Sequence, residues 1–205
     1  MLIRGVGGKA DVLVVAVDGV KVVVKDFAPR KAWARLAGRL QIARETRAYA
    51  RLRGVPGVPA FVGRIDPWAL AVEHVEGERL AFAKIPPADG PRHVARLRAI
   101  LDAIHARGIV HNDLRGRENV LLRADGDLAV VDFAAAARFR PGSLAHRLVF
   151  KALAMADEAA FLKWKGLLAP GSYTTAESIY LRRFERWRAL WPFNPKRRKA
   201  KAGTA

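Results

Sequence analysis

Three polar residues in the second half of the chain have the types and the spacing that phosphoryl transfer requires. Asp113 and Asn119 lie in one segment, His111-Asn-Asp-Leu-Arg-Gly-Arg-Glu-Asn119, and Asp132 follows an apolar run further along. A carboxylate can orient and deprotonate an acceptor hydroxyl, while amide and carboxylate oxygens can bind the Mg²⁺ that neutralises phosphates. We therefore predict that Asp113 is the catalytic base and that Asn119 and Asp132 are metal ligands.

The elements around these residues are expected to bring them together. Two short apolar runs, 120–122 and 128–131, flank a turn and predict a hairpin with Asn119 and Asp132 at its two ends. Residues 97–108, just upstream of the polar segment, have a helical pattern. The alternative is that these polar residues are ordinary turn residues, as Asp and Asn often are.

The N-terminal part of the chain contains a second predicted hairpin. Residues 11–27 alternate and then run apolar around Asp18-Gly19, a pair that favours tight hairpin turns. Lys25 lies in the second strand of this hairpin. A lysine there can solubilise an edge strand, so its position alone does not assign it a chemical role.

A helix is predicted over residues 29–53, with a break at Gly38. One face of this helix carries Ile42, Glu45, Tyr49 and Leu52. Glu45 is the one acidic residue of the segment. Because an unpaired buried carboxylate is costly, we expect Glu45 to have a cationic partner, either elsewhere in the chain or within the helix itself.

The polar segment resembles the catalytic loop His-Arg-Asp-Leu-x-x-x-Asn of the protein-kinase-like superfamily, and Asp132-Phe-Ala134 resembles its Asp-Phe-Gly. This chain departs from the two motifs in two ways, and both features are similar to those of the small atypical prokaryotic members, the RIO-like and lipopolysaccharide Kdo-kinase-like families. Asn119 follows Asp113 by six positions where the superfamily has five, and alanine replaces the glycine. The additional loop residue leaves open a shift of the metal ligand to Glu118.

The resemblance implies an ATP site and a role for several more residues. Lys25 would hold the α- and β-phosphates of ATP, and Glu45 would position Lys25 by pairing with it. A glycine-containing loop would cover the phosphates, and a hinge segment would bind adenine through its backbone. The implied nucleotide-binding residues outside the hairpins are Gly5, Gly7, Gly8, Glu73 and Val75. A plain turn is the alternative for the glycines, because the Gly-x-Gly-x-x-Gly pattern is not intact.

The resemblance also implies a fold. We expect an α+β, two-lobed protein-kinase-like fold, with a small antiparallel-sheet N-lobe at residues 1–75 and a mainly helical C-lobe at residues 76–193. Residues 194–205 are expected to form a basic flexible tail. The helix predicted from 145 to about 168 leaves no room for a long activation segment, the platform on which kinases dock peptides.

The expected activity is transfer of the γ-phosphoryl group of Mg-ATP to a hydroxyl acceptor, either a serine/threonine protein or a lipopolysaccharide-core sugar. Two other classes stay open. A pseudokinase scaffold would explain the altered glycine loop and Ala134, although a scaffold has no physical need for the full catalytic set. A basic adaptor that binds membrane or nucleic acid through its tail is the third interpretation.

The composition restricts the partners and the chemistry. With 37 Lys and Arg against 19 Asp and Glu, the net charge is +18, which attracts polyanions without choosing among them. Cysteine is absent, so disulfides and thiolate chemistry are excluded. Without a long apolar run or a signal peptide, we expect a cytoplasmic protein. Residues 180–201 interleave aromatic and cationic side chains. This pattern favours packing on the C-lobe; the alternatives, in decreasing order, are peripheral contact with the inner face of an anionic membrane and binding of nucleic acid.

Overall fold

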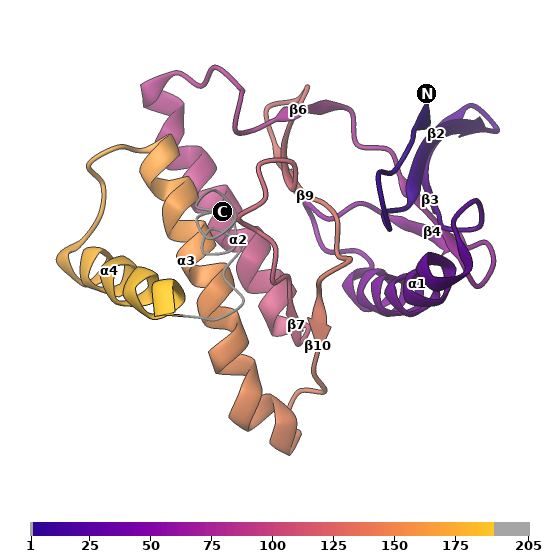
Figure 1. The fold of residues 1–205 in the computed structure, drawn as a ribbon. Helices are drawn as coiled ribbons and strands as arrows, with labels where there is room; N and C mark the ends of the chain where they lie inside the picture. Colours follow the sequence, from indigo (N-terminus) through magenta and orange to yellow (C-terminus); the bar gives the residue numbers. More distant parts are fainter. Residues whose placement is uncertain (1, 191–205) are drawn as a thin grey trace, which may run out of the picture.

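The computed structural model describes residues 2–190 and has a mixed α+β architecture, which confirms the α+β part of the predicted fold (Figure 1). The N-terminal part is an antiparallel sheet of five strands in the order β1-β2-β3-β5-β4. Its strands are β1 (Leu2–Ile3), β2 (Asp11–Val17), β3 (Val20–Asp26), β4 (Phe61–Arg64) and β5 (Ala69–Glu73). Helix α1 (Ala32–Leu52) connects β3 to β4 and lies beside this sheet.

The rest of the described chain is mainly helical, with short strands lying between the helices and the first sheet (Figure 1). These strands are β6 (Gly77–Arg79), β8 (Val120–Arg123) and β9 (Leu128–Val130), which form one sheet, and β7 (Ile109–Val110) paired with β10 (Ala137–Arg138). The helical elements are a 3₁₀ turn (Pro87–Asp89), α2 (Gly90–Ala106), a π turn (His146–Phe150), α3 (Lys151–Leu168) and α4 (Thr175–Leu190).

Both predicted hairpins are confirmed. Strands β2 and β3 pair from Asp11↔Asp26 to Val17↔Val20, and the turn residues Asp18 and Gly19 adopt φ angles of 50° and 80°. Two positive φ values are what a type I′ turn requires, and aspartate and glycine tolerate them best. Strands β8 and β9 form the second hairpin, with Val120 opposite Val130.

Helix α1 is continuous, so the predicted break at Gly38 is wrong. A Cβ atom on Gly38 would lie 2.3 Å from Cγ of Phe27, a side chain that is itself buried. The glycine is therefore explained by close packing of α1 against the Phe27 ring, at the end of β3. Phe27 fills the space where a side chain at position 38 would stand.

Helix α4 begins at Thr175, earlier than the aromatic and cationic stretch suggests. Thr174 and Glu177 form reciprocal bonds at its start: the Glu177 N–H donates to Thr174 Oγ1 (3.2 Å) and the Thr174 N–H donates to Glu177 Oε2 (2.7 Å). This is a capping box, which satisfies backbone groups that a helix end leaves free. Phe184 is buried, which agrees with packing on the helical part, while the predicted basic tail lies outside the described residues.

One hydrophobic core joins the first sheet, α1 and the later helices. Tyr49 of α1 packs edge-on against Phe133, with their ring centroids 5.1 Å apart. Phe133 directly follows Asp132, so core packing fixes the backbone next to a predicted site residue. Within residues 2–190, no helix combines the length and apolarity that crossing a bilayer would need.

Candidate active site

Lys25, on β3, is the centre of the polar contacts between the first sheet and the rest of the chain. Its Nζ lies 2.6 Å from Glu45 Oε1 of α1 and 2.8 Å from Asp132 Oδ1, which follows β9. The Lys25 side chain is 13% exposed. Burial would lower the pKa of Lys25, but the carboxylates of Glu45 and Asp132 outweigh burial and raise it, so the ammonium stays charged.

Glu45 has the cationic partner that its position on the helix requires. Its side chain is fully buried, and the expected pairing with Lys25 is confirmed as a contact. Burial raises the pKa of Glu45, and the nearby Lys25 ammonium opposes that rise. Glu45 is the one acidic residue of the segment 29–53, which is otherwise basic. Its ion pair holds the Lys25 side chain in place.

Asp132 is the more accessible of the two carboxylates on Lys25, with 45% of its side chain exposed. Burial of the rest would raise its pKa, but the Lys25 ammonium outweighs that effect and lowers the pKa of Asp132. Asp132 also has a φ angle of 66°, and Asn112, on the other side of the site, has one of 63°. Asp and Asn adopt this left-handed region more readily than other non-glycine residues, and such conformations often occur at functional sites.

Asp113 and Asn119 contact each other across the turn between β7 and β8. Asn119 Nδ2 donates to the Asp113 carbonyl (2.7 Å) and to Asp113 Oδ2 (3.1 Å), while Asp113 is exposed. Because the amide nitrogen is engaged in this way, Oδ1 is the atom of Asn119 that remains to bind a cation. This is the orientation that a metal ligand requires.

Gly116 lies at the centre of the loop between Asp113 and Asn119. Its N–H donates to the Asp113 carbonyl (3.0 Å), and its own carbonyl accepts from the Asn119 N–H (3.1 Å), so two tight turns follow each other. A Cβ on Gly116 would lie 2.6 Å from Asn119 Nδ2. Glu118 instead pairs with Arg79 (3.1 Å) and is 68% exposed, so the contact with Asp113 belongs to Asn119.

The β8–β9 hairpin brings its two ends together, as predicted. The Val131 N–H donates to the Asn119 carbonyl (2.9 Å), which places the residue before Asp132 against Asn119. Ion pairs thus join Glu45, Lys25 and Asp132, hydrogen bonds join Asn119 to Asp113, and the Val131–Asn119 backbone bond places the two groups next to each other.

His111 fixes the backbone of this loop and takes a defined neutral form. Its Nδ1 accepts from the Asp113 N–H (3.2 Å), so the proton is on Nε2, which donates to the Val131 carbonyl (3.1 Å). The ring is fully buried, and burial lowers the pKa of His111. The residue thus ties the Asp113 loop directly to the hairpin that carries Asp132.

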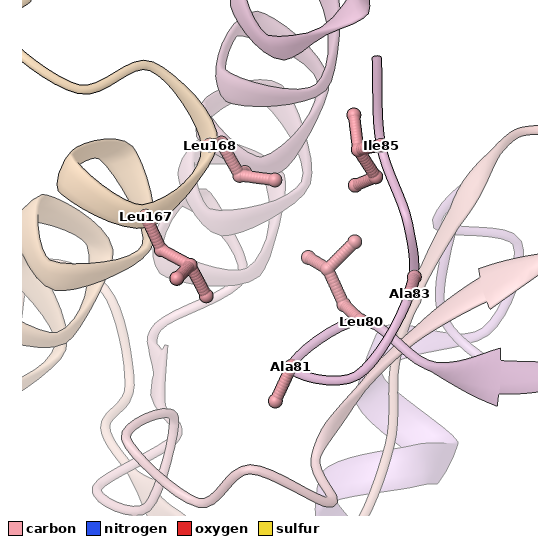
Figure 2. Close-up of a pocket in the computed structure, with 6 residues that line it drawn as sticks. All are labelled: Leu80, Ala81, Ala83, Ile85, Leu167 and Leu168. Atoms are coloured by element: carbon pink, nitrogen blue, oxygen red, sulfur yellow. The ribbon is translucent and has the colours of Figure 1, made fainter. Parts of the chain in front are cut away.

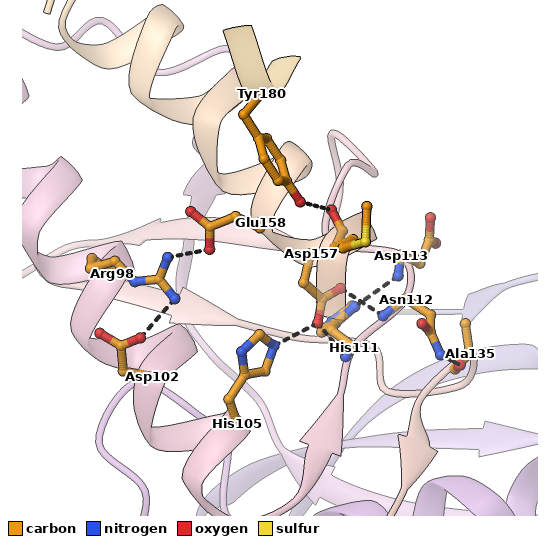
Figure 3. A network of polar contacts seen from close by, with 11 residues as sticks. Arg98, Asp102, His105, His111, Asn112, Asp113, Ala135, Asp157, Glu158 and Tyr180 are labelled. Atoms are coloured by element: carbon orange, nitrogen blue, oxygen red, sulfur yellow. Dashed lines mark hydrogen bonds and ion pairs between the residues drawn. The ribbon is translucent and has the colours of Figure 1, made fainter. Parts of the chain in front are cut away.

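Asp157, on α3, is a site residue that sequence reasoning missed. It is fully buried, and its carboxylate accepts from the N–H groups of His111 (2.7 Å) and Asn112 (2.8 Å) and contacts His105 Nε2 (3.0 Å) (Figure 3). His105 packs in this network through its contact with Asp157. The one sequence signal for Asp157 is an acidic residue within an apolar helical stretch.

The glycine loop between β1 and β2 is only partly suited to binding phosphate. A Cβ on Gly5 would lie 2.3 Å from a backbone carbonyl, and the Gly5 N–H donates to Asp11 Oδ1 (2.7 Å). Gly5 therefore closes the loop, and its amide is already engaged. Gly7 has a φ of 67°, and a Cβ on Gly8 would lie 3.1 Å from the Trp33 ring. Phosphate covering stays a prediction that depends on Gly7 and Gly8.

The expected hinge residues lie where the first sheet ends. The Glu73 N–H donates to the Ala60 carbonyl (2.8 Å), and its carboxylate accepts from the Ala60 N–H (2.8 Å). Val75 is buried between β5 and β6. The contact of Glu73 and Val75 with adenine stays a prediction.

The donor set suits a metal that arrives with phosphates better than a fully protein-bound metal. Within residues 2–190, no group of three or more His, Cys, Asp or Glu side chains could hold a metal ion. Mg²⁺ commonly takes one or two protein ligands and completes its shell with phosphate oxygens and water. Asp132 and the Oδ1 atom of Asn119 would supply such a pair.

No model of a protein family matches this chain, and no curated protein matches it. A proposal about function therefore depends on the contacts described above.

Proposed function

We propose that the protein is an ATP-dependent phosphotransferase that moves the γ-phosphoryl group of Mg-ATP to a hydroxyl acceptor. The observation that carries this proposal is that the backbone bond between Val131 and Asn119 places the Glu45–Lys25–Asp132 ion pairs next to the Asn119–Asp113 pair. These residues belong to four separate parts of the chain, and ordinary turn residues would have no reason to converge in this way.

Each residue has a role that follows from its surroundings. Asp113, exposed and held by Asn119, orients the acceptor hydroxyl and takes its proton. Asn119 and Asp132 supply oxygen ligands, and Lys25 offers a permanently charged ammonium to phosphate oxygens. Bound Mg²⁺ would neutralise the charge of the phosphates during transfer. Glu45 keeps Lys25 in position and does not touch the reacting atoms.

The arrangement is proposed to be a small two-lobed protein-kinase-like fold. In this proposal the sheet with α1 is the N-lobe, the described residues from 76 to 190 belong to the C-lobe, and the segment from Glu73 to Val75 is the hinge. The connection from β10 to the π turn is short, which supports an acceptor smaller than a broadly recognised peptide, such as a sugar or a lipid-linked hydroxyl. A restricted serine/threonine protein is the other acceptor class, and a cytoplasmic location is part of the same proposal.

The proposal is tested first by nucleotide binding. Mg-ATP at about a hundred times its Kd should stabilise the wild-type protein by about 3 kcal/mol, measured as an increase in Tm. Lys25→Met and Asp132→Asn should abolish the increase. Lys21→Met removes an exposed lysine on the same strand, paired with Glu76, and should keep it.

Asp132→Asn is the variant less expected to misfold. The Asp132 side chain is partly exposed, and its replacement leaves the buried Lys25–Glu45 pair in place. A Tm increase of wild-type size in Asp132→Asn would overturn the assignment of the metal ligand. If Mg-ATP stabilises neither the wild type nor the variants, the phosphotransferase proposal fails and a binding scaffold takes its place.

A further inference from the structure

A second set of functional groups lies beside the Asp113 loop, in a pocket of about 360 Å³ between this loop, α3 and the segment after β6. Three of the lining side chains are cationic and the others are apolar. The lining residues are Ala81, Phe82, Arg115, Arg117, Ala160, Lys163, Trp164 and Leu167. None of them belongs to the group of residues around Lys25.

The pocket is fixed to the residue next to Asp113. Trp164, a buried residue of its wall, donates from Nε1 to the Leu114 carbonyl (2.9 Å). Arg115 and Arg117 follow Asp113 by two and four positions in the same loop. A molecule held in this pocket would therefore lie close to the carboxylate that we assign as the base.

The charges in the pocket are not balanced. Glu185 pairs with two of the three cations, at 3.4 Å from Arg115 and 3.3 Å from Lys163. Among the described residues, no other carboxylate forms an ion pair with these two, and Arg117 has no ion pair. Arg115 Nη1 is buried without a hydrogen-bond partner. Burial lowers the pKa of Lys163, and repulsion from Arg115 lowers it further. Three positive charges against one carboxylate favour an added anion.

The apolar part of the pocket continues into a neighbouring recess of about 120 Å³ (Figure 2). The two share Ala81 and Leu167. Phe82 and Leu167 are both more than half exposed and line the pocket beside the cations. The site thus combines an oxyanion-binding wall with a surface that can contact the uncharged part of a ligand.

We propose that this pocket binds a phosphate monoester group on the acceptor and so presents a neighbouring hydroxyl to Asp113. Two guanidinium groups match the oxygens of a phosphate, and a dianion uses the excess positive charge better than a carboxylate does. The role as an acceptor subsite depends on the phosphotransferase function proposed above, while anion binding by the pocket does not.

The test is direct binding without ATP, so its outcome is independent of any transfer activity. Calorimetry compares glucose 6-phosphate with glucose on the full chain and on an Arg117→Gln/Lys163→Gln variant. Both replaced residues are exposed, and the variant's Tm checks folding. Arg44→Gln, on the exposed face of α1, is a control that removes one positive charge away from the pocket, against two in the pocket variant.

We expect the wild type to prefer glucose 6-phosphate to glucose, and the pocket variant to bind it at least about tenfold more weakly. Arg44→Gln should bind as the wild type does. Equal weakening in Arg44→Gln would mean general attraction by the basic surface and would overturn the proposal. Unchanged binding in the pocket variant would overturn it as well.

A parallel sedimentation assay uses phosphatidylcholine vesicles with and without phosphatidic acid. Binding to the phosphatidic acid vesicles that the pocket variant loses would identify a lipid-linked phosphate as the source of the group. Binding of glucose 6-phosphate alone would identify a soluble sugar phosphate. If the pocket binds phosphate but the wild type never turns over ATP, the phosphotransferase proposal fails and the anion site stands.

Discussion

Lys25 of β3 and Glu45 of α1 form an ion pair in which Nζ and Oε1 are 2.6 Å apart and the glutamate side chain is fully buried. Asp132 contacts the same ammonium from the other side. The pair fixes α1 to the sheet and points the ammonium at the residue that we assign as a metal ligand. Removing one member of a buried pair leaves the other charge without compensation.

Lys25→Met should therefore destabilise the protein by about 3–5 kcal/mol, because Glu45 would remain buried and unpaired. Glu45→Gln should cost less, because Lys25 keeps Asp132 as a partner. Chemical denaturation of both variants and the double variant completes a double-mutant cycle. A coupling near zero between the two substitutions would contradict the structural role of the pair.

Asp157 should be needed for the backbone geometry of the Asp113 loop. Asp157→Asn replaces one carboxylate oxygen with an amide that cannot accept from the loop N–H groups, so we expect a loss of about 2–4 kcal/mol in unfolding free energy. Glu158→Gln, the next residue on α3, removes only a partly exposed contact with Arg98 and should cost about 1 kcal/mol or less. Equal losses in the two variants would argue against this role for Asp157.

Gly38→Ala should destabilise the protein although alanine favours helices. The gain in helix propensity is about 1 kcal/mol, but the new Cβ would collide with the buried Phe27 ring, and overpacking costs about 1–3 kcal/mol. Gly63→Ala, in β4, meets no atom within 4 Å and is the control. Adding Phe27→Leu to Gly38→Ala should recover part of the loss. A variant more stable than the wild type would show that position 38 has room.

Local signals in the sequence were enough to predict the hairpins and the need of Glu45 for a cationic partner, while Lys25 as that partner was implied only by the resemblance to kinases. Asp18-Gly19 fixes its turn through its own φ preferences, and a lone carboxylate on an apolar helix face needs a cation wherever one lies. Gly38 was misread because a helix pattern does not show that the Phe27 ring occupies its missing side chain. Asp157 was missed because its partners, His111 and Asn112, are 46 and 45 positions away. Such contacts are created by tertiary packing.

Stability should decrease as the pH falls below about 6.5, in part through His111. Burial lowers the pKa of His111, so the unfolded chain takes up a proton in a range where the folded chain does not, and unfolding becomes easier. Protonation of Nδ1 would also break its bond with the Asp113 N–H. His93, whose pKa burial also lowers, adds to the effect.

The measurement is the free energy of unfolding between pH 7 and pH 5 for the wild type and for His111→Gln. One proton contributes at most about 1.4 kcal/mol per pH unit. The variant should be less stable at pH 7 and lose less stability on acidification. The same slope in both proteins would show that His111 does not titrate in this way.

The most direct test of the account is Mg²⁺-dependent turnover of ATP by the wild type, Asp113→Asn and Glu118→Gln. Loss of a catalytic base should lower the rate of Asp113→Asn by about 10²–10⁴-fold while Mg-ATP binding is kept. Glu118→Gln, on the same loop but directed to Arg79, should retain the wild-type rate. Turnover that survives in Asp113→Asn, or a wild type without Mg²⁺-dependent turnover, would contradict the assignment of this site as a phosphotransferase centre.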